Sequence, residues 1–322
     1  MKLAIIGASY GQLPLCLKAK QMGLETICFA WENGAICRDY VDKFYPISIF
    51  EKERILDVCR EEKVDGVVSN ASDVLAEVVA FLAEELGLIG NKFQNILLIK
   101  NKQYVRSLTS DIENLKSIRY DKYEREDSQF YPCVIKPITG ASKKGVFFVD
   151  SKDSFNQAIL YAKEVSDDIL IEEYIIGREI SVETISYRGE HRVVQFTDKE
   201  NSGAPNFVEL AYHQPAELSE SIKIKISKVM VDILNRIGFE NGAAHIEIKI
   251  DNNDNLYLIE VNPRGGGDEI SAQLVQLSTG YDYLRAMIEV ALGTFQFSNI
   301  NTKLYSGICF LCNQTKERVD FF

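Results

Sequence analysis

The sequence has no apolar run approaching the roughly 20 residues that a membrane helix needs, and the apolar segment at residues 3–8 is too short to be one. We therefore expect no membrane or signal segment and a cytoplasmic protein. Basic residues are also scarce, with 36 Lys and Arg against 47 Asp and Glu and a formal net charge of −11. A nucleic acid partner is disfavoured, and any phosphate chemistry must depend on locally placed cations.

The cysteines lack the pattern of a disulfide framework. There are seven, an odd number, and they lie mostly in apolar stretches, which favours buried reduced thiols. Cys309 and Cys312 form a CxxC pair, but no second pair and no nearby histidine accompany it. A zinc or redox site is therefore disfavoured.

A dinucleotide fingerprint is absent as well. Apolar runs alternate with amphipathic segments over the first 90 residues, which predicts a parallel sheet covered by helices. Gly7 and Gly11 follow the first predicted strand in the pattern GASYGQ, which differs from GxGxxG, and no acidic residue ends the second strand. An oxidoreductase is therefore a distant alternative.

The length of 322 residues predicts two or three lobes. We expect a parallel α/β domain over 1–92 and a small ββαβ lid over 121–175. Segments 93–120 and 176–322 should form a mainly antiparallel sheet flanked by helices, with hairpin turns at 188–190 and 251–255 and a helix over 270–292. The fold class is thus mixed α/β and α+β.

The strongest chemical signal is the second hairpin, where Glu247 lies on one strand and Glu260 and Asn262 end the other. Strand alternation places Glu260 and Asn262 on one face, and hairpin pairing brings Glu247 beside them. Two carboxylates and an amide oxygen suit Mg²⁺ or Mn²⁺. The alternative is a solvated strand end, but Glu260 follows an apolar run, where an unpaired charge is costly.

Arg264 follows directly and precedes three glycines, which allow a ligand to approach the backbone closely. A guanidinium matches phosphate oxygens in bidentate fashion, so Arg264 is a candidate for stabilising charge on a transferring phosphoryl group. An ion pair with Asp268 across the glycine turn is the structural alternative. Asp268 is itself a candidate substrate contact.

Lys136 ends an otherwise apolar strand and is followed by a loop of small residues, 139–145, that contains Ser142 and Lys143. Small residues expose N–H groups and hydroxyls to phosphate oxygens, so the lysine and the loop are candidates for binding a polyphosphate. The alternative is a lysine that extends to solvent.

Acidic residues follow in a further strand and just beyond it. A strand edge at a hinge can offer a carbonyl and an N–H to a purine, while a carboxylate a few residues on holds ribose hydroxyls. Glu172 with the backbone of Glu173 and Ile175 would then contact the base, and Glu179 the sugar. An exposed charged strand is the alternative.

Four separated motifs, IKPITGASKKGV, LIEEYIIGREISVE, HIEIKI and LIEVNPRGGGD, together resemble the ATP-grasp superfamily over nearly the whole chain. The N-terminal segment GASYGQLPLCLKAKQMG is similar to the domain that precedes the ATP-grasp unit in the carboxylase and carbamoyl-phosphate synthase branch of this superfamily. The resemblance implies ATP and Mg²⁺ as cofactors. It also implies that Lys102 and Lys136 contact the phosphates, that residues 172–175 bind adenine and that Glu179 binds ribose. Mg²⁺ would be held by Glu247, Glu260 and Asn262, and Arg264 would stabilise the acyl-phosphate transition state.

Sixty residues follow Asn262, too few for the C-terminal lobe of a biotin carboxylase, and one unit is not the duplicated carbamoyl-phosphate synthase. The chain is thus similar to stand-alone carboxylate–amine ligases, including those that join amino acids. Segment 197–215 should line the acceptor pocket, with Lys199, Glu209 and His213 as candidates. A solvated loop is the alternative there.

The expected function is an ADP-forming ligase that activates a carboxylate as an acyl phosphate for capture by an amine. Its partners would be small molecules, with a homodimer left open. The alternatives are an ATP-dependent carboxylase acting through carboxyphosphate and a binding module without turnover. The second is disfavoured because a decayed site should have lost one of its candidate residues, and all are present.

Overall fold

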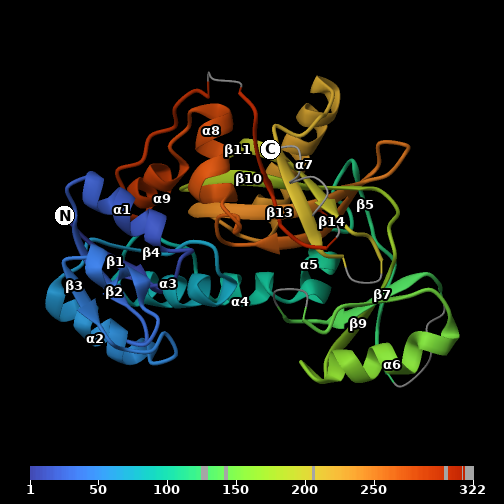
Figure 1. Ribbon diagram of the computed structural model, residues 1–322, viewed down its shortest axis with the longest axis horizontal. Helices are drawn as coiled ribbons and strands as arrows, with labels where there is room; N and C mark the ends of the chain where they lie inside the picture. Colours follow the sequence, from blue (N-terminus) through green and yellow to red (C-terminus); the bar gives the residue numbers. More distant parts are fainter. Residues whose placement is uncertain (125–129, 141–143, 205–206, 301–303, 314, 316–322) are drawn as a thin grey trace.

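A computed structural model covers residues 1–322 and describes 1–124, 130–140, 144–204, 207–300, 304–313 and 315 (Figure 1). The described residues form three sheets, named here A, B and C in chain order of their first strands, B being the largest. Ser142 and Lys143 lie outside the described residues. The predicted mixed α/β class is confirmed, with one parallel, one mainly antiparallel and one antiparallel sheet.

Sheet A is built from the N-terminal segment, as the alternating apolar pattern predicted. Its four strands have the order β3-β2-β1-β4 and run parallel. The strands are almost fully apolar because helices cover them, which buries both faces. The elements are β1 (Lys2–Ile6), α1 (Leu13–Gln21), β2 (Glu25–Phe29), the 3₁₀ helix Ile36–Tyr40, β3 (Lys43–Tyr45), α2 (Lys52–Glu62), β4 (Gly66–Val68) and α3 (Asp73–Leu86).

Sheet C is the predicted ββαβ unit with one further strand, in the antiparallel order β6-β9-β7-β8. Helix α6 covers it because Phe155, Ala158, Ile159 and Ala162 recur on one face and pack on Ile135. The elements are β6 (Tyr120–Lys122), β7 (Cys133–Pro137), β8 (Phe147–Val149), α6 (Lys152–Lys163) and β9 (Ile169–Glu173).

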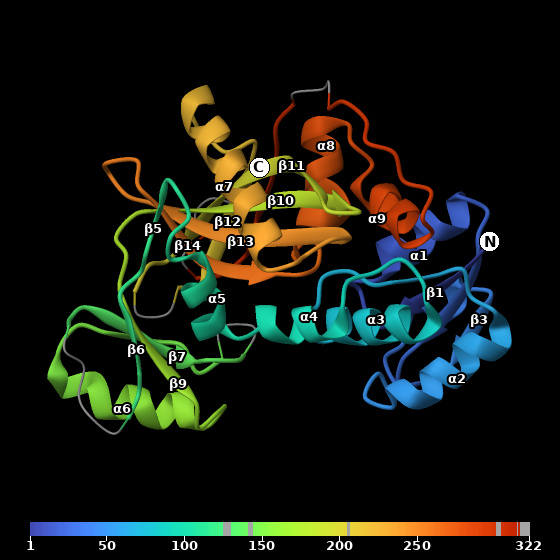
Figure 2. The same cartoon turned by 180° about the vertical axis from the view of Figure 1, so that it is seen from behind.

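Sheet B has the order β15-β12-β11-β10-β13-β14-β5 and is antiparallel except for the β14–β5 pair. Helix α7 packs its apolar side on one face, and α8 and α9 lie over the other (Figures 1 and 2). Both predicted hairpins are confirmed. The elements are β5 (Leu115–Lys116), β10 (Arg178–Tyr187), β11 (Glu190–Asn201), β12 (Glu209–Gln214), α7 (Glu220–Arg236), β13 (Gly242–Ile250), β14 (Leu256–Asn262), α8 (Val275–Thr279), α9 (Tyr283–Ala291) and β15 (Ser306–Cys309).

Two short helices lead from sheet A to β5 of sheet B. α4 (Phe93–Ile99) and α5 (Lys102–Thr109) follow α3 in a row along the edge of sheet B in both views (Figures 1 and 2). The Asn101 side chain caps α5 by accepting a hydrogen bond from the Tyr104 N–H at 2.9 Å. α5 therefore brings its charged side chains to the junction of sheets B and C.

The single helix predicted over 270–292 is wrong. A π-helix, Ile270–Leu274, runs into α8, and α9 starts only at Tyr283. Gly280 ends α8 in a left-handed conformation with φ of 73°, and the Asp282 side chain caps α9 through the Arg285 N–H. The apolar pattern continues across this break, so periodicity alone concealed it. Nowhere in the described part of the chain is a helix long and apolar enough to cross a membrane.

Candidate active site

A cleft lies between sheets C and B. Sheet C contributes its strand-end lysine and carboxylates, α5 contributes one lysine, and sheet B contributes the carboxylates of β10, β13 and β14. Most residues predicted to bind ATP or metal therefore line one cavity. They are Lys102, Lys136, Glu172, Glu173, Ile175, Glu179, Glu247 and Glu260.

The sheet C side holds a cationic cluster formed by Arg106, Lys136 and Glu172. The Glu172 carboxylate lies 2.6 Å from Lys136 Nζ and 2.9 Å from Arg106 Nε, and all three side chains are buried. Arg106 also donates from Nη2 to the Ile259 carbonyl oxygen at 2.8 Å. Arg106 therefore connects sheet C to β14, one residue before Glu260.

Burial and charge shift the pKa values in this cluster. Burial lowers the pKa of the Lys136 ammonium, which Glu172 partly offsets. Burial works in the opposite direction on Glu172, but Arg106 and Lys136 outweigh it and lower the pKa of that carboxyl to about 2. Glu172 is thus ionised and holds Lys136 in the cleft. Its predicted contact with a purine stays a prediction, because both its oxygens face cations here.

The sheet B side holds an acidic cluster formed by Lys199, Glu179, Glu209 and Glu247. The buried Lys199 Nζ lies 2.7 Å from Glu247, 3.0 Å from Glu179 and 3.4 Å from Glu209. Burial opposes the charge of Lys199, yet these three carboxylates raise the pKa of its ammonium well above the usual range. Lys199 thereby holds together the predicted ribose and metal carboxylates.

Segment 197–215 is not simply a solvated loop, since Lys199 lies on β11 and Glu209 and His213 on β12. Lys199 is only 8% exposed. By contrast, the His213 side chain is 60% exposed and does not line the cleft. The three candidates are therefore split between the acidic cluster and the surface.

The predicted metal ligands lie together at the β13–β14 pair. Glu247 is directly opposite Glu260, and His245 is opposite Asn262. Glu260 contacts Lys102 Nζ at 2.8 Å, and the Asn262 amide nitrogen donates to the His245 carbonyl at 3.3 Å. Two carboxylates facing each other, each balanced by a lysine, and an amide oxygen nearby fit a hard cation. The described residues contain no metal-competent group of three or more His, Cys, Asp or Glu side chains.

Arg264 pairs with a residue of the N-terminal segment, not with Asp268. Its Nε lies 3.0 Å from Asp73 Oδ1 on α3, and its Nη1 donates to the Gly265 carbonyl at 3.1 Å. Asp268, in a left-handed conformation with φ of 48°, instead accepts a hydrogen bond from the Tyr212 hydroxyl at 3.3 Å. The alternative of an Arg264–Asp268 pair is not observed, because the turn directs Asp268 towards β12.

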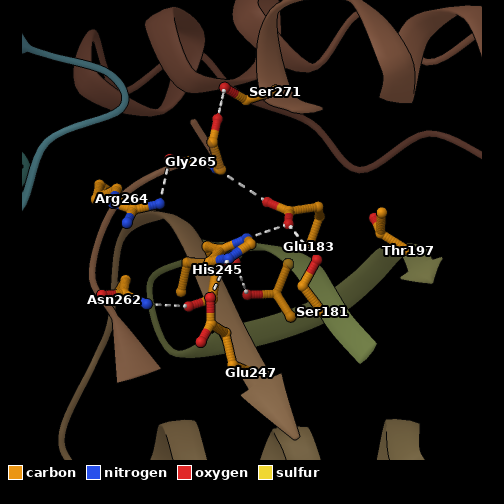
Figure 3. A network of polar contacts seen from close by, with 12 residues as sticks. Ser181, Glu183, Thr197, His245, Glu247, Asn262, Arg264, Gly265 and Ser271 are labelled. Atoms are coloured by element: carbon orange, nitrogen blue, oxygen red, sulfur yellow. Dashed lines mark hydrogen bonds and ion pairs between the residues drawn. The ribbon is translucent and has the colours of Figure 1, made fainter. Parts of the chain in front are cut away.

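A polar network that sequence reasoning missed lies behind the glycine turn (Figure 3). Glu183 and His245 contact each other at 2.5 Å, and Glu183 also accepts from the Gly266 N–H at 3.1 Å. Burial opposes the imidazolium, but Glu183 raises the pKa of His245 to about 9. The available signal was spacing, since Glu183 is two strand periods from Glu179 and so lies on the same face.

The far end of the cleft carries aromatic rings that the motifs did not reveal. The centroid of the Tyr174 ring lies 4.8 Å from the centroid of the Phe148 ring and 6.0 Å from that of the Phe207 ring. Lys249 lies over the Tyr174 ring and donates to the Ile175 carbonyl at 3.0 Å. This carbonyl is among the backbone groups predicted to contact a purine.

Residues 129–273 match the family profile of the ATP-grasp domain. The chain is 22% identical to the formate-dependent phosphoribosylglycinamide formyltransferase of Wolinella succinogenes, over 82% of this chain and 70% of the relative. It is 25% identical to the arginine-specific carbamoyl phosphate synthase large chain of Bacillus subtilis, over 77% of this chain. It spans only 25% of that synthase.

Two solved structures also superpose on most of this chain. An L-amino acid ligase from Bacillus licheniformis superposes with a TM-score of 0.80 at 28% identity, covering 95% of this chain and 78% of the ligase. The biotin carboxylase domain of the 2-oxoglutarate carboxylase of Hydrogenobacter thermophilus superposes with a TM-score of 0.81 at 20% identity, covering 96% and 74%. The second likeness concerns the fold alone.

Proposed function

We propose that this chain, which belongs to the ATP-grasp superfamily, is an ADP-forming ligase that activates a carboxylate as an acyl phosphate and joins it to an amine. The observation that carries the proposal is the cleft, where lysines and carboxylates predicted from separate motifs come together. The similarity to an L-amino acid ligase makes an amino acid a prime candidate substrate.

ATP would bind with its phosphates towards Lys102 and Lys136 and its base towards Tyr174 and Ile175, all of which line the cleft. Glu247, Glu260 and Asn262 would hold Mg²⁺, which would supply positive charge to neutralise the phosphates. We further propose that sheet C is the lid, within segment 121–175. Segment 1–92 would then be a separate domain, and segments 93–120 and 176–322 the remainder of the ATP-grasp unit.

The reaction has two steps. A carboxylate oxygen attacks the γ-phosphorus of ATP, the bond to the bridging oxygen breaks, and ADP leaves. The amine then attacks the acyl carbon, loses a proton, and releases phosphate that retains one carboxylate oxygen. Arg264 is suited to the charge that develops on the phosphoryl group, because its guanidinium offers a fork of donors held in place by Asp73.

The test is a screen of ATP turnover with Mg²⁺ over pairs of amino acids or small carboxylates with amines, including bicarbonate. We expect release of ADP and phosphate that depends on one acid, with an amide product detected by mass spectrometry. AMP with pyrophosphate as the main products would contradict the proposal. Turnover supported by bicarbonate alone would indicate a carboxylase instead.

We also propose a cytoplasmic protein, because the cysteines lack the sequence pattern of a disulfide framework. A homodimer remains a separate proposal. Light scattering at micromolar concentration tests it, and a monomeric mass would contradict it.

A further inference from the structure

Glu183 is a fully buried carboxylate for which the proposed reaction provides no role. It lies on β10 with 0% of its surface exposed. A buried charge is costly unless donors satisfy it. Here both oxygens have one, since Oε1 contacts His245 Nδ1 at 2.5 Å and Oε2 accepts from the backbone N–H of Gly266 at 3.1 Å (Figure 3).

These two contacts lead to two different parts of the candidate site. The other ring nitrogen of His245, Nε2, lies 3.3 Å from Glu247 Oε1, a predicted metal ligand. Gly266 follows Arg264 by two residues on the glycine turn. Glu183 therefore lies between the metal carboxylate and the turn that carries the phosphoryl-binding arginine.

The glycine turn, residues 265–267, is held by contacts with residues outside the turn. A Cβ on Gly266 would lie 3.0 Å from His245 Nδ1 and 2.8 Å from Ile270, so the backbone approaches this pair as only glycine can. The Gly266 carbonyl accepts a hydrogen bond from Ser271 Oγ at 2.6 Å, and that hydroxyl also contacts Asn70 Oδ1 at 2.9 Å. Glu183 and the N-terminal domain thus hold the turn from opposite sides.

We propose that Glu183 and His245 are positioning residues that fix the glycine turn relative to Glu247, and thereby set Arg264 against the phosphates of ATP. The inference rests on the proposed function for its catalytic part. Its structural part, the anchoring of the turn by Glu183, is measurable without turnover.

Glu183→Gln is the most direct variant. Its amide keeps one accepting oxygen but presents an NH₂ group to the second donor, so either Gly266 or His245 loses its acceptor. We expect kcat of the acid-dependent reaction to fall by a factor on the order of 10 to 10², with the KM for ATP nearly unchanged. Hydrogen exchange at the Gly266 amide should become faster. The matched control is Glu190→Gln, at an exposed carboxylate at the start of β11. It should change neither kcat nor the rate of hydrogen exchange at the Gly266 amide.

His245→Gln is the second variant, and the melting temperature and ADP binding of both are measured in parallel. Wild-type ADP affinity with a lower kcat and faster exchange supports the proposal. Unchanged kcat in either folded variant overturns it, as does failure of both to fold, because the pair would then be purely structural. If the wild-type protein shows no acid-dependent ADP release, the proposed function fails. The exchange experiment then decides the anchoring alone, and wild-type exchange at Gly266 in Glu183→Gln overturns that too.

Discussion

The two sides of the cleft carry opposite unbalanced charge. In the cationic cluster, Arg106 and Lys136 surround the single carboxylate of Glu172. In the acidic cluster, Lys199 faces the carboxylates of Glu179, Glu209 and Glu247. His245 also contacts Glu247, at 3.3 Å. Counted over the named members of each cluster, the cationic cluster has an excess of one positive charge and the acidic cluster an excess of two negative charges.

This difference supports the proposed binding of Mg²⁺-ATP. Buried charges that lack counter-charges destabilise a fold, so an excess of either sign is a cost that a bound ligand relieves. A polyphosphate meets the need of the cationic cluster, and a divalent cation meets that of the acidic cluster. Mg²⁺-ATP brings both together. A cleft that bound only a neutral ligand would not require this separation.

The largest expected effect comes from removing Lys136, a cation that lines the cleft on the sheet C side. Lys136→Met should lower kcat/KM for ATP by a factor on the order of 10³, because the phosphates lose an ammonium and Glu172 keeps only Arg106. Steady-state kinetics measures this. Lys152→Met, exposed at the start of α6, serves as the control. A loss below tenfold would remove Lys136 from the site.

The next largest effect tests the metal ligands beside the acidic cluster. Glu260→Gln should reduce ADP release by a factor on the order of 10² to 10³ at fixed Mg²⁺, because one hard anionic ligand opposite Glu247 is lost. The melting temperature should hardly change, since the Glu260 side chain is partly exposed. A variant that keeps most activity would contradict the metal assignment.

A smaller effect separates charge from geometry in the cationic cluster. Arg106→Lys keeps the charge but cannot contact Glu172 through two nitrogens while donating to Ile259. We expect kcat/KM for ATP to fall by a factor on the order of 10. Ser107→Ala, exposed on the same helix, is the control. Full activity of Arg106→Lys would mean that charge alone matters at this position.

Lys199→Met tests the acidic cluster through its effect on the free energy of unfolding. Without the lysine, three carboxylates face one another, so unfolding free energy should fall by about 3 kcal/mol. Mg²⁺ should then raise the melting temperature of the variant more than that of the wild type. Thermal denaturation with and without Mg²⁺ measures both. Equal Mg²⁺ effects in the two proteins would show that the cation does not bind beside this cluster.

Local patterns predicted the parts of the site that lie close in sequence. The pairing of Glu247 with Glu260 followed from strand alternation and the short turn at 251–255, and the structure places them opposite each other. The same reasoning placed Lys136 at a strand end, where it lines the cleft.

Long-range contacts remained hidden, because no local pattern specifies them. Asp73 and Arg264 are separated by 191 positions, and Arg106 and Glu172 by 66. Each pair joins elements that are far apart in the chain, so only the assembled fold brings its members together. His245 and Glu183 each lie within one of the four motifs, yet they are 62 positions apart, so neither motif alone predicted their contact.

Transfer of an oxygen atom from the carboxylate to the released phosphate would demonstrate the acyl-phosphate intermediate. Once the screen has identified the acid, its carboxylate is labelled with ¹⁸O and the phosphate released in the presence of the amine is examined by ³¹P NMR. We expect one ¹⁸O atom in each phosphate, because the carboxylate oxygen that attacked the γ-phosphorus leaves with it. Phosphate without ¹⁸O, released as product forms, would show that no acyl phosphate is made.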